Sequence, residues 1–206
     1  GWRGVSERFK HIHLNNNFMQ TYEIIESAIQ KKKTTWDKFC EEYQASFGGL
    51  YQRYKKHNIF GDVAQEQVEK TVYGCYPLHP VSTFILPRLS ERVAQNERTL
   101  FTFISAPGNS TLPAFLDKYE DDHFEVITPD LIYDYFEPLF KKEVYGGSIH
   151  ENYILTELIL EKLSDESLEK KIVKTLALVY ILEQFEKLRP SKDELISIYS
   201  ISYTPE

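Results

Sequence analysis

Apolar side chains recur at helical spacing along most of the chain. A series that includes Ile25 and Ile29 predicts a helix over residues 17–32, and Asn17 with Gln20 has the form of a capping box at its start. Because this 3.6-residue period dominates the sequence, we expect a mainly α-helical bundle.

Aromatic residues continue the same spacing. Trp36, Phe39 and Tyr43 lie on one side of a second predicted helix, and we expect them to be core residues. Gly48 and Gly49 are expected to end this helix, because glycine weakens a helix interior.

A third helix is predicted from Asp62, whose capping partner is Gln65, to about Tyr73. Residues 76–80 are expected to be extended, since a proline pushes the residue before it out of the helical region. Pro80 itself suits a first helical position, so a further helix is predicted to start there.

The helix that starts at Pro80 is predicted to reach about Ile104, with a kink or interruption at Pro87. The small and polar residues of 105–111 give the strongest loop signal in the chain. Capping chemistry predicts three more helix starts, at Thr128, Ser148 and Ser191.

Alternation of apolar and polar residues at 8–14 predicts one short strand. Near the other end, a long helix from about Leu168, a turn at 188–190 and a second short helix are arranged as at the beginning of a winged-helix domain. The sequence therefore predicts three parts: the strand-containing end of a preceding domain over 1–16, a helical lid-like domain over 17–164, and the start of a winged-helix-like domain over 165–206.

Composition narrows the class of protein. With 206 residues, 42% of them hydrophobic, the chain is long and apolar enough to bury a core. No apolar run approaches the ~20 residues of a membrane helix, so no membrane partner is expected. The net charge of −7 argues against non-specific binding of nucleic acid. Cys40 and Cys75 have no metal-type spacing and do not form a disulfide framework, which indicates a cytoplasmic protein.

No complete catalytic site is found in the sequence. None of the nine glycines begins the G-x-x-x-x-G-K-[ST] pattern of a phosphate loop. His11 with His13 and the acidic residues of 120–123 lack the ligand sets of metal sites, so no metal site is assigned. Cys75 lies four residues before His79, but a buried structural thiol is the favoured interpretation.

One segment combines arginines with a polar residue on an apolar face. On a helical wheel Asn96 falls in the middle of the apolar side, while Arg88, Arg92 and Gln95 form the adjoining side, with Arg98 beside them. Arginine offers a planar fork of donors suited to phosphate, so the cluster is a candidate for sensing a nucleotide. The alternative is a helix surface held by salt bridges at i,i+3 and i,i+4 spacing.

A family resemblance rests on three runs. Residues 76–80, 86–92 and 95–103, the last the most specific, resemble the region that follows the catalytic core in large bacterial P-loop ATPases of the AAA+/STAND kind, including ATPases of phage-resistance systems. In such proteins the core with the phosphate loop precedes this region, and a helical lid and winged helix follow it. Since this chain begins without Met at Gly1, we expect it to be cut from such a parent.

The resemblance implies site residues of two kinds. Nucleotide-sensing arginines are expected at Arg98, Arg92 and Arg88, and structural support at Asn96, Gln95 and His79. ATP and Mg²⁺ would belong to the parent protein, and no cofactor is expected in this chain. The implied partners are the preceding ATPase core in cis, neighbouring subunits and, with weak support, nucleic acid.

Two functions follow from the sequence. The first is a non-catalytic regulatory fragment of a P-loop ATPase that couples nucleotide state to the engagement of a partner or nucleic acid. The second is a stand-alone helical module that binds proteins through an aromatic-rich surface. In neither case do we expect enzymatic activity from this chain itself.

Overall fold

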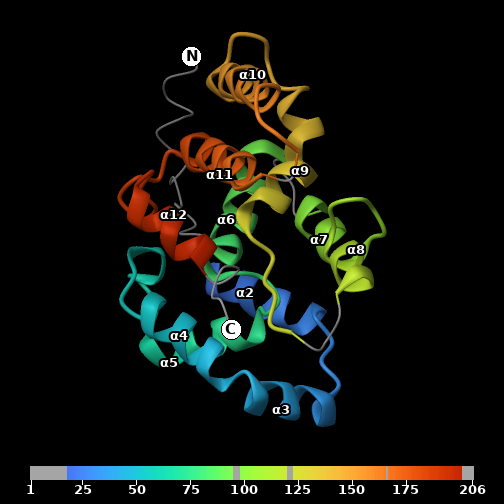
Figure 1. Ribbon diagram of the computed structural model, residues 1–206, viewed down its shortest axis with the longest axis vertical. Coiled ribbons are helices and arrows are strands. Elements are labelled where there is room, and N and C mark those ends of the chain that lie inside the picture. Colours follow the sequence, from blue (N-terminus) through green and yellow to red (C-terminus); the bar gives the residue numbers. More distant parts are fainter. Residues whose placement is uncertain (1–17, 95–97, 120–122, 166, 201–206) are drawn as a thin grey trace, which may run out of the picture.

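Figure 1 shows the computed structural model, which describes residues 18–94, 98–119, 123–165 and 167–200. Within these ranges the backbone forms helices joined by short turns, and one parallel bridge between Leu78 and Ile127 is the extent of β pairing. The expected mainly α-helical fold is confirmed. The strand expected at 8–14 lies outside the described residues.

The helices follow one another along the chain with the labels of Figure 1. They are α2 (Phe18–Ala28), α3 (Lys33–Glu42), α4 (Gln44–Tyr54), the 3₁₀ turn η1 (Asn58–Phe60), α5 (Gln65–Gly74), α6 (Pro80–Leu89), the π turn η2 (Ser90–Ala94), α7 (Arg98–Ser105), α8 (Leu112–Lys118), α9 (Pro129–Phe140), α10 (Ser148–Leu160), α11 (Leu168–Leu182) and α12 (Lys192–Tyr199). Among them, none has the length and apolarity that crossing a membrane requires.

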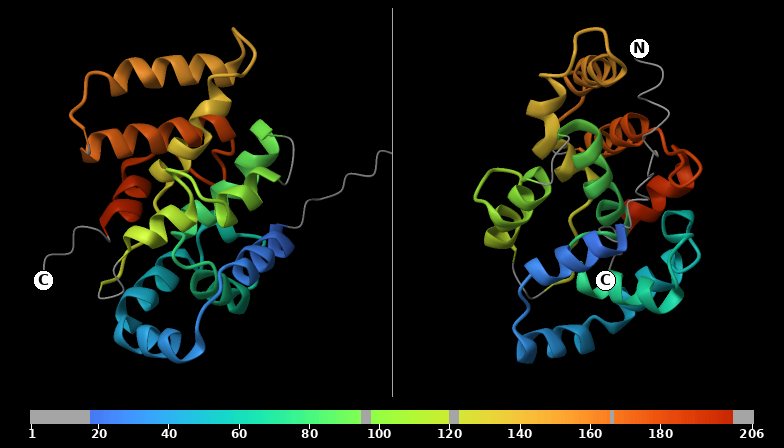
Figure 2. Two further views of the ribbon diagram at one scale, coloured as in Figure 1. Left: turned by 90° about the vertical axis from the view of Figure 1, so that its right-hand side faces the viewer. Right: turned by 180° about the vertical axis from the view of Figure 1, so that it is seen from behind.

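Helix α6 occupies the centre of the molecule. All of its residues are buried, and it packs against α2 on one side and against α9 and α11 on the other. As Figures 1 and 2 show, α2 to α5 gather at one end and α9 to α11 at the opposite end, with α7 and α8 along one flank. Helix α12 connects the ends, because Arg53 of α4 donates to the Ser197 carbonyl and Tyr199 bonds to Asp130 of α9.

One hydrophobic cluster extends from Tyr22 in α2 to Tyr199 in α12. The domain boundary expected between 164 and 165 falls in the turn between α10 and α11, and buried residues on both sides of it belong to this cluster. The division of the chain into domains, including the winged-helix-like end, stays a prediction.

Gly48 and Gly49 do not end a helix, contrary to the sequence-based expectation. They lie inside α4, whose Phe47, Leu50 and Tyr54 are buried. The helix that carries Trp36 ends earlier, at Glu42. Packing of the apolar side of α4 therefore outweighs the local cost of two glycines.

The helix expected from Pro80 to Ile104 is divided, but not at Pro87. Pro80 occupies the first turn of α6 as predicted, and Pro87 lies within the same helix, which continues to Leu89. The π turn η2 comes next, and a separate helix begins at Arg98. Burial of α6 on all sides outweighs the cost of an internal proline.

Smaller differences concern helix ends. The first described helix ends at Ala28 rather than near residue 32, and α5 begins at Gln65 without a side-chain cap from Asp62. The Asp62 carboxylate instead accepts a hydrogen bond from Lys187 at 2.7 Å. Ser148 is the first residue of α10, one position after the cap. The other two predicted starts are correct, since Thr128 and Ser191 precede α9 and α12 directly.

Candidate functional site

Arg88, one of the predicted nucleotide-sensing residues, belongs to the core. Its side chain donates hydrogen bonds to the Tyr22 hydroxyl at 2.7 Å and to the Phe84 carbonyl at 2.9 Å. The guanidinium also lies 4.0 Å from the ring centroid of Phe18 and 3.8 Å from that of Phe84. A phosphate group would reach Arg88 only by displacing these contacts between α2 and α6.

Arg92 is more accessible than Arg88. Its Nη2 lies 2.6 Å from Oε2 of Glu183, and the two side chains are 34% and 53% exposed. The ion pair ties η2 to the end of α11, where Glu183 closes the helix with a φ of 55°. An exposed pair of this kind contributes little stability, so Glu183 can exchange for another anion.

The remaining predicted residues of this segment are not placed. Gln95 and Asn96 lie outside the described residues, and Arg98 starts α7 with a side chain that is likewise outside them. The single helical wheel that put Asn96 in the middle of an apolar face does not apply, because the π turn at Ser90–Ala94 changes the helical period before it. A nucleotide-sensing role for these arginines stays a prediction.

His79 supports the start of α6. It is fully buried, and its Nδ1 accepts a hydrogen bond from the Val81 backbone N–H at 3.1 Å. Burial lowers the pKa of His79 to about 3, so the ring is neutral and carries its proton on Nε2. The ring meets that of Tyr54 edge to face, with centroids 5.3 Å apart. These contacts are structural.

Cys75 is a buried thiol. It is 1% exposed, and its Sγ lies 3.6 Å from the Tyr22 carbonyl oxygen. Burial raises the pKa of Cys75 to about 12, which leaves almost no nucleophilic thiolate at neutral pH.

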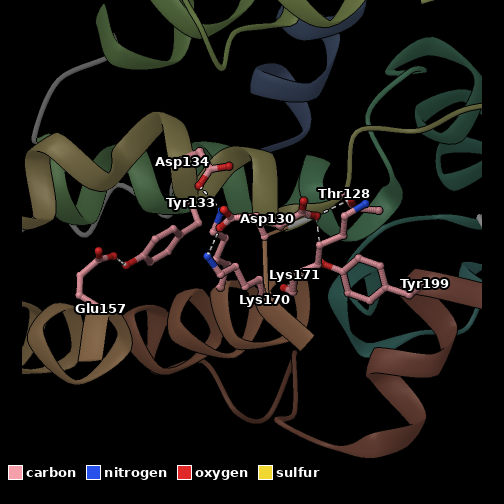
Figure 3. A network of polar contacts seen from close by, with 10 residues as sticks. Thr128, Asp130, Tyr133, Asp134, Glu157, Lys170, Lys171 and Tyr199 are labelled. Atoms are coloured by element: carbon pink, nitrogen blue, oxygen red, sulfur yellow. Dashed lines mark hydrogen bonds and ion pairs between the residues drawn. The ribbon is translucent and has the colours of Figure 1, made fainter. Parts of the chain in front are cut away.

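A polar network lies between α9, α11 and α12 (Figure 3). The Tyr199 hydroxyl is 2.6 Å from the Thr175 hydroxyl and donates to Asp130 at 3.0 Å. Next to it, Asp134 pairs with Lys174 at 2.6 Å. Burial raises the pKa of the Asp134 carboxyl, although Lys174 opposes this shift.

Helices α9, α10 and α11 form a cleft of about 290 Å³, lined by four carboxylates and two lysines. Its Glu157 accepts a hydrogen bond from Tyr133 at 2.9 Å, and its Glu137 accepts one from Tyr153 at 2.7 Å. In the part of the chain that the structure describes, no three acidic, histidine or cysteine side chains are arranged to hold a metal ion. His11 and His13, considered above as metal ligands, lie outside the described residues, and so do residues 120–122 of the acidic run.

The opposite end of the molecule contains a cluster of stacked and edge-on rings. Phe47 of α4 is its centre: its ring centroid lies 4.4 Å from that of Tyr73, 5.1 Å from Tyr76 and 5.0 Å from Phe124. Trp36 joins the cluster from α3, 5.7 Å from Phe47. These rings come from α3, α4, α5 and two non-helical segments, so tertiary packing and not spacing within one helix brings them together.

Beside this cluster lies a pocket with a volume of about 330 Å³. We call it the aromatic pocket. Its apolar wall consists of Ile29, Trp36, Phe39, Tyr76, Pro77 and Leu116, and its polar groups belong to Gln30, Lys31, Lys32, Thr35 and Tyr119. The lining contains two lysines and no carboxylate, so the pocket favours an apolar group next to a negative charge.

Two groups of contacts hold the polar side chains of the aromatic pocket in place. Lys31 donates a hydrogen bond to the Gly74 carbonyl, and its Nζ lies 5.0 Å from the ring centroid of Trp36. Burial lowers the pKa of Lys31. Across the pocket the hydroxyls of Tyr76 and Tyr119 are 2.8 Å apart. The polar groups are therefore positioned before any ligand arrives.

Comparisons with models of protein families, with curated proteins and with solved structures found no match. The resemblance to P-loop ATPases stays a prediction.

Sequence reasoning found the residues of the aromatic pocket without finding the pocket. Phe39 is a core residue as expected, and Trp36 is half-buried and lines the pocket. The available signal was the lysine run 31–33, three residues before Trp36, because it puts positive charge near a large ring. The lysines lie at the junction of two helices, and the rest of the lining includes two distant segments, at 76–77 and 116–119, so sequence spacing could not show the cavity.

Proposed function

We propose that this chain is a helical protein-interaction module without a catalytic centre of its own, and that the aromatic pocket receives a side chain of its partner. The observation that carries the proposal is the combination of size and chemistry. A volume of about 330 Å³ is near the lower end of the ~300–1,000 Å³ range of ligand pockets, which suits one large side chain and its neighbours.

The lining selects the chemistry of the partner. Trp36, Tyr76 and Phe39 offer ring faces and edges to an aromatic or large aliphatic side chain. Lys31 and Lys32 attract a negative charge next to it. The partner segment is therefore expected to carry Phe or Leu flanked by Asp or Glu.

A peptide series tests this proposal. Labelled peptides with one central Phe, flanked by Asp in one set, Ser in a second and Lys in a third, are titrated with the chain by fluorescence polarisation. We expect saturable binding in the order Asp, Ser, Lys. Leu116→Glu, which puts a carboxylate into the wall, and the charge reversal Lys32→Glu should each weaken binding of the acidic peptide by about tenfold or more.

A matched variant outside the pocket is Tyr180→Ala, which removes an aromatic ring that is 51% exposed on α11. Its affinity should equal that of the unchanged chain. Absence of saturable binding throughout the series, or equal binding by Leu116→Glu, would reject the aromatic pocket as the binding site.

A second candidate, supported by the exposed pair of Arg92 with Glu183, is the regulatory fragment of a larger cytoplasmic P-loop ATPase. ATP and Mg²⁺ would be held by the preceding core, and Arg92 would exchange its carboxylate partner for a phosphate oxygen. In the intact protein, Arg92→Ala and Arg98→Ala are expected to lower ATP turnover without changing the helical content. Turnover equal to that of the unchanged protein would remove both residues from the proposal.

A further inference from the structure

Helix α10 is the outermost helix at its end of the molecule (Figures 1 and 2). It packs on α9 and α11, and it does so through Tyr153, Thr156 and Leu160, which are buried on its inner side. Its opposite side faces away from the rest of the fold.

The outward side is as apolar as the inward one. Leu155 is 61% exposed, Leu158 52%, Ile154 44% and Ile159 39%. On a helix these four positions are neighbours along one face, so they form a continuous aliphatic strip, which we call the α10 outer face. Monomeric proteins seldom expose such strips, and when they do the strip is commonly an interaction site.

The α10 outer face is symmetric along the helix. Ile154 and Ile159 lie equally far from the midpoint at 156–157, and so do Leu155 and Leu158. When two such helices run antiparallel with these midpoints opposed, isoleucine meets isoleucine and leucine meets leucine. The strip is thus complementary to a second copy of itself.

The charges that border the strip have the same symmetry with opposite signs. Glu151 is exposed one turn before the strip, and Lys162 is exposed in the turn that follows it. Both lie equally far from the same midpoint. In an antiparallel pair each Glu151 faces the partner's Lys162, which gives two ion pairs, whereas a parallel pair would oppose two Glu151 carboxylates.

We propose that two copies of this chain associate through the α10 outer face, as an antiparallel pair about a two-fold axis through the midpoint of the strip. Val144 and Tyr145, 77% and 90% exposed in the loop before α10, extend the apolar area at each end. The contact is smaller than a typical permanent interface, so the dimer should be weak and should dissociate on dilution. The α10 outer face and the loop before it share no residue with the aromatic pocket. The proposed self-association is therefore independent of the function proposed for that pocket.

Sedimentation of the 206-residue chain over a roughly hundredfold range of concentration tests the proposal. The expected result is a shift from monomer to dimer as concentration rises. Leu158→Asp should raise the dissociation constant at least about tenfold, because it buries a carboxylate opposite leucine. The matched control is Ile196→Asp on α12, since Ile196 is also 52% exposed and should leave the dimer unchanged.

Exchange of the bordering charges tests the antiparallel register itself. Glu151→Lys and Lys162→Glu should each weaken the dimer, because each puts like charges opposite one another, and the double variant should restore it. Far-UV circular dichroism of all variants checks that the helices are intact. A monomer at every concentration, a dimer unaffected by Leu158→Asp, or no restoration by the double variant would each overturn the proposal.

Discussion

The two ends of the molecule use their apolar residues in opposite ways. At the end formed by α2 to α5, aromatic rings around Phe47 point inward and leave the aromatic pocket beside them. At the end formed by α9 to α11, aliphatic side chains of α10 such as Leu155 and Leu158 point outward. The first end has its apolar pocket beside the rings, whereas the second exposes its apolar residues on the outer side of α10 and has a charged cleft on the inner side of that helix.

The shape of the side chains explains the difference. Aromatic rings are large, rigid plates that meet at preferred angles, so a group of them can enclose a space that none of them fills. A helix with aliphatic residues on all sides has no concave surface and can cover its outer side only against another flat or ridged surface. A hollow site and a convex strip therefore suit different partners, an inserted side chain in one case and a second helix in the other.

The largest expected effect on stability comes from replacing Phe47, the centre of the ring cluster. This side chain is fully buried, and Phe47→Ala removes ring contacts to α3, α5 and the segment after α8 at once. We expect a loss of about 3–5 kcal/mol in the free energy of unfolding measured with urea. Phe101→Ala, which removes a ring that is 38% exposed, serves as the control and should cost far less. Equal losses would mean that the ring cluster is not the core of this end.

The next largest effect on stability is expected at Arg88, which links α6 to α2. Arg88→Ala leaves the Tyr22 hydroxyl without its partner inside the protein and removes a charge that two rings enclose, so we expect a loss of roughly 3 kcal/mol. Arg92→Ala removes only the exposed pair with Glu183 and should cost about 1 kcal/mol or less. Urea unfolding of both variants measures the difference. Similar losses would contradict the division of the arginines between core and surface.

The sequence predicts the kind of elements better than their limits. The fold class and the starts of α6, α9 and α12 follow from apolar periodicity and from local chemistry at Pro80, Thr128 and Ser191, because caps and first-turn prolines act within a few residues. The glycines of α4 and Pro87 misled the analysis, since burial of the surrounding residues outweighs a local preference.

The candidate sites depend on contacts that sequence spacing does not contain. Arg88 looked like a surface residue because a helical wheel of its segment ignored the π turn at Ser90–Ala94 and the approach of Tyr22 from α2. The aromatic pocket joins α3 and the connection before it to Tyr76 and to α8. The α10 outer face was missed because exposure is not visible in a helix that is apolar on all sides.

His79 lies just before α6, next to the bridge between Leu78 and Ile127, and it should make the stability of the protein depend on pH. Burial lowers its pKa from 6.5 to about 3, so below pH 6.5 the unfolded chain takes up a proton that the folded protein excludes. Stability is therefore lost as the pH falls, by roughly 1–2 kcal/mol between pH 6.5 and about pH 5. His79→Asn keeps a side chain that can cap a helix but does not titrate. Urea unfolding of the two proteins should show a flatter pH dependence for the variant, and parallel curves would contradict a buried neutral His79.

The smallest expected effect is a gain, and it tests whether α4 is a continuous helix beneath the ring cluster. Gly48 and Gly49 have no atom within 4 Å of the position a Cβ would take, so alanine fits without a clash. Alanine also restricts the unfolded chain and favours a helix interior, so Gly48→Ala and Gly49→Ala should each stabilise the protein by about 0.5–1 kcal/mol. The urea midpoint measures this, with Gly146→Ala as the opposite control, because its φ of 78° disfavours alanine. If either α4 variant is less stable than the unchanged chain, the helix ends at the glycines, as the sequence pattern indicates, and Phe47 and Tyr54 then belong to separate elements.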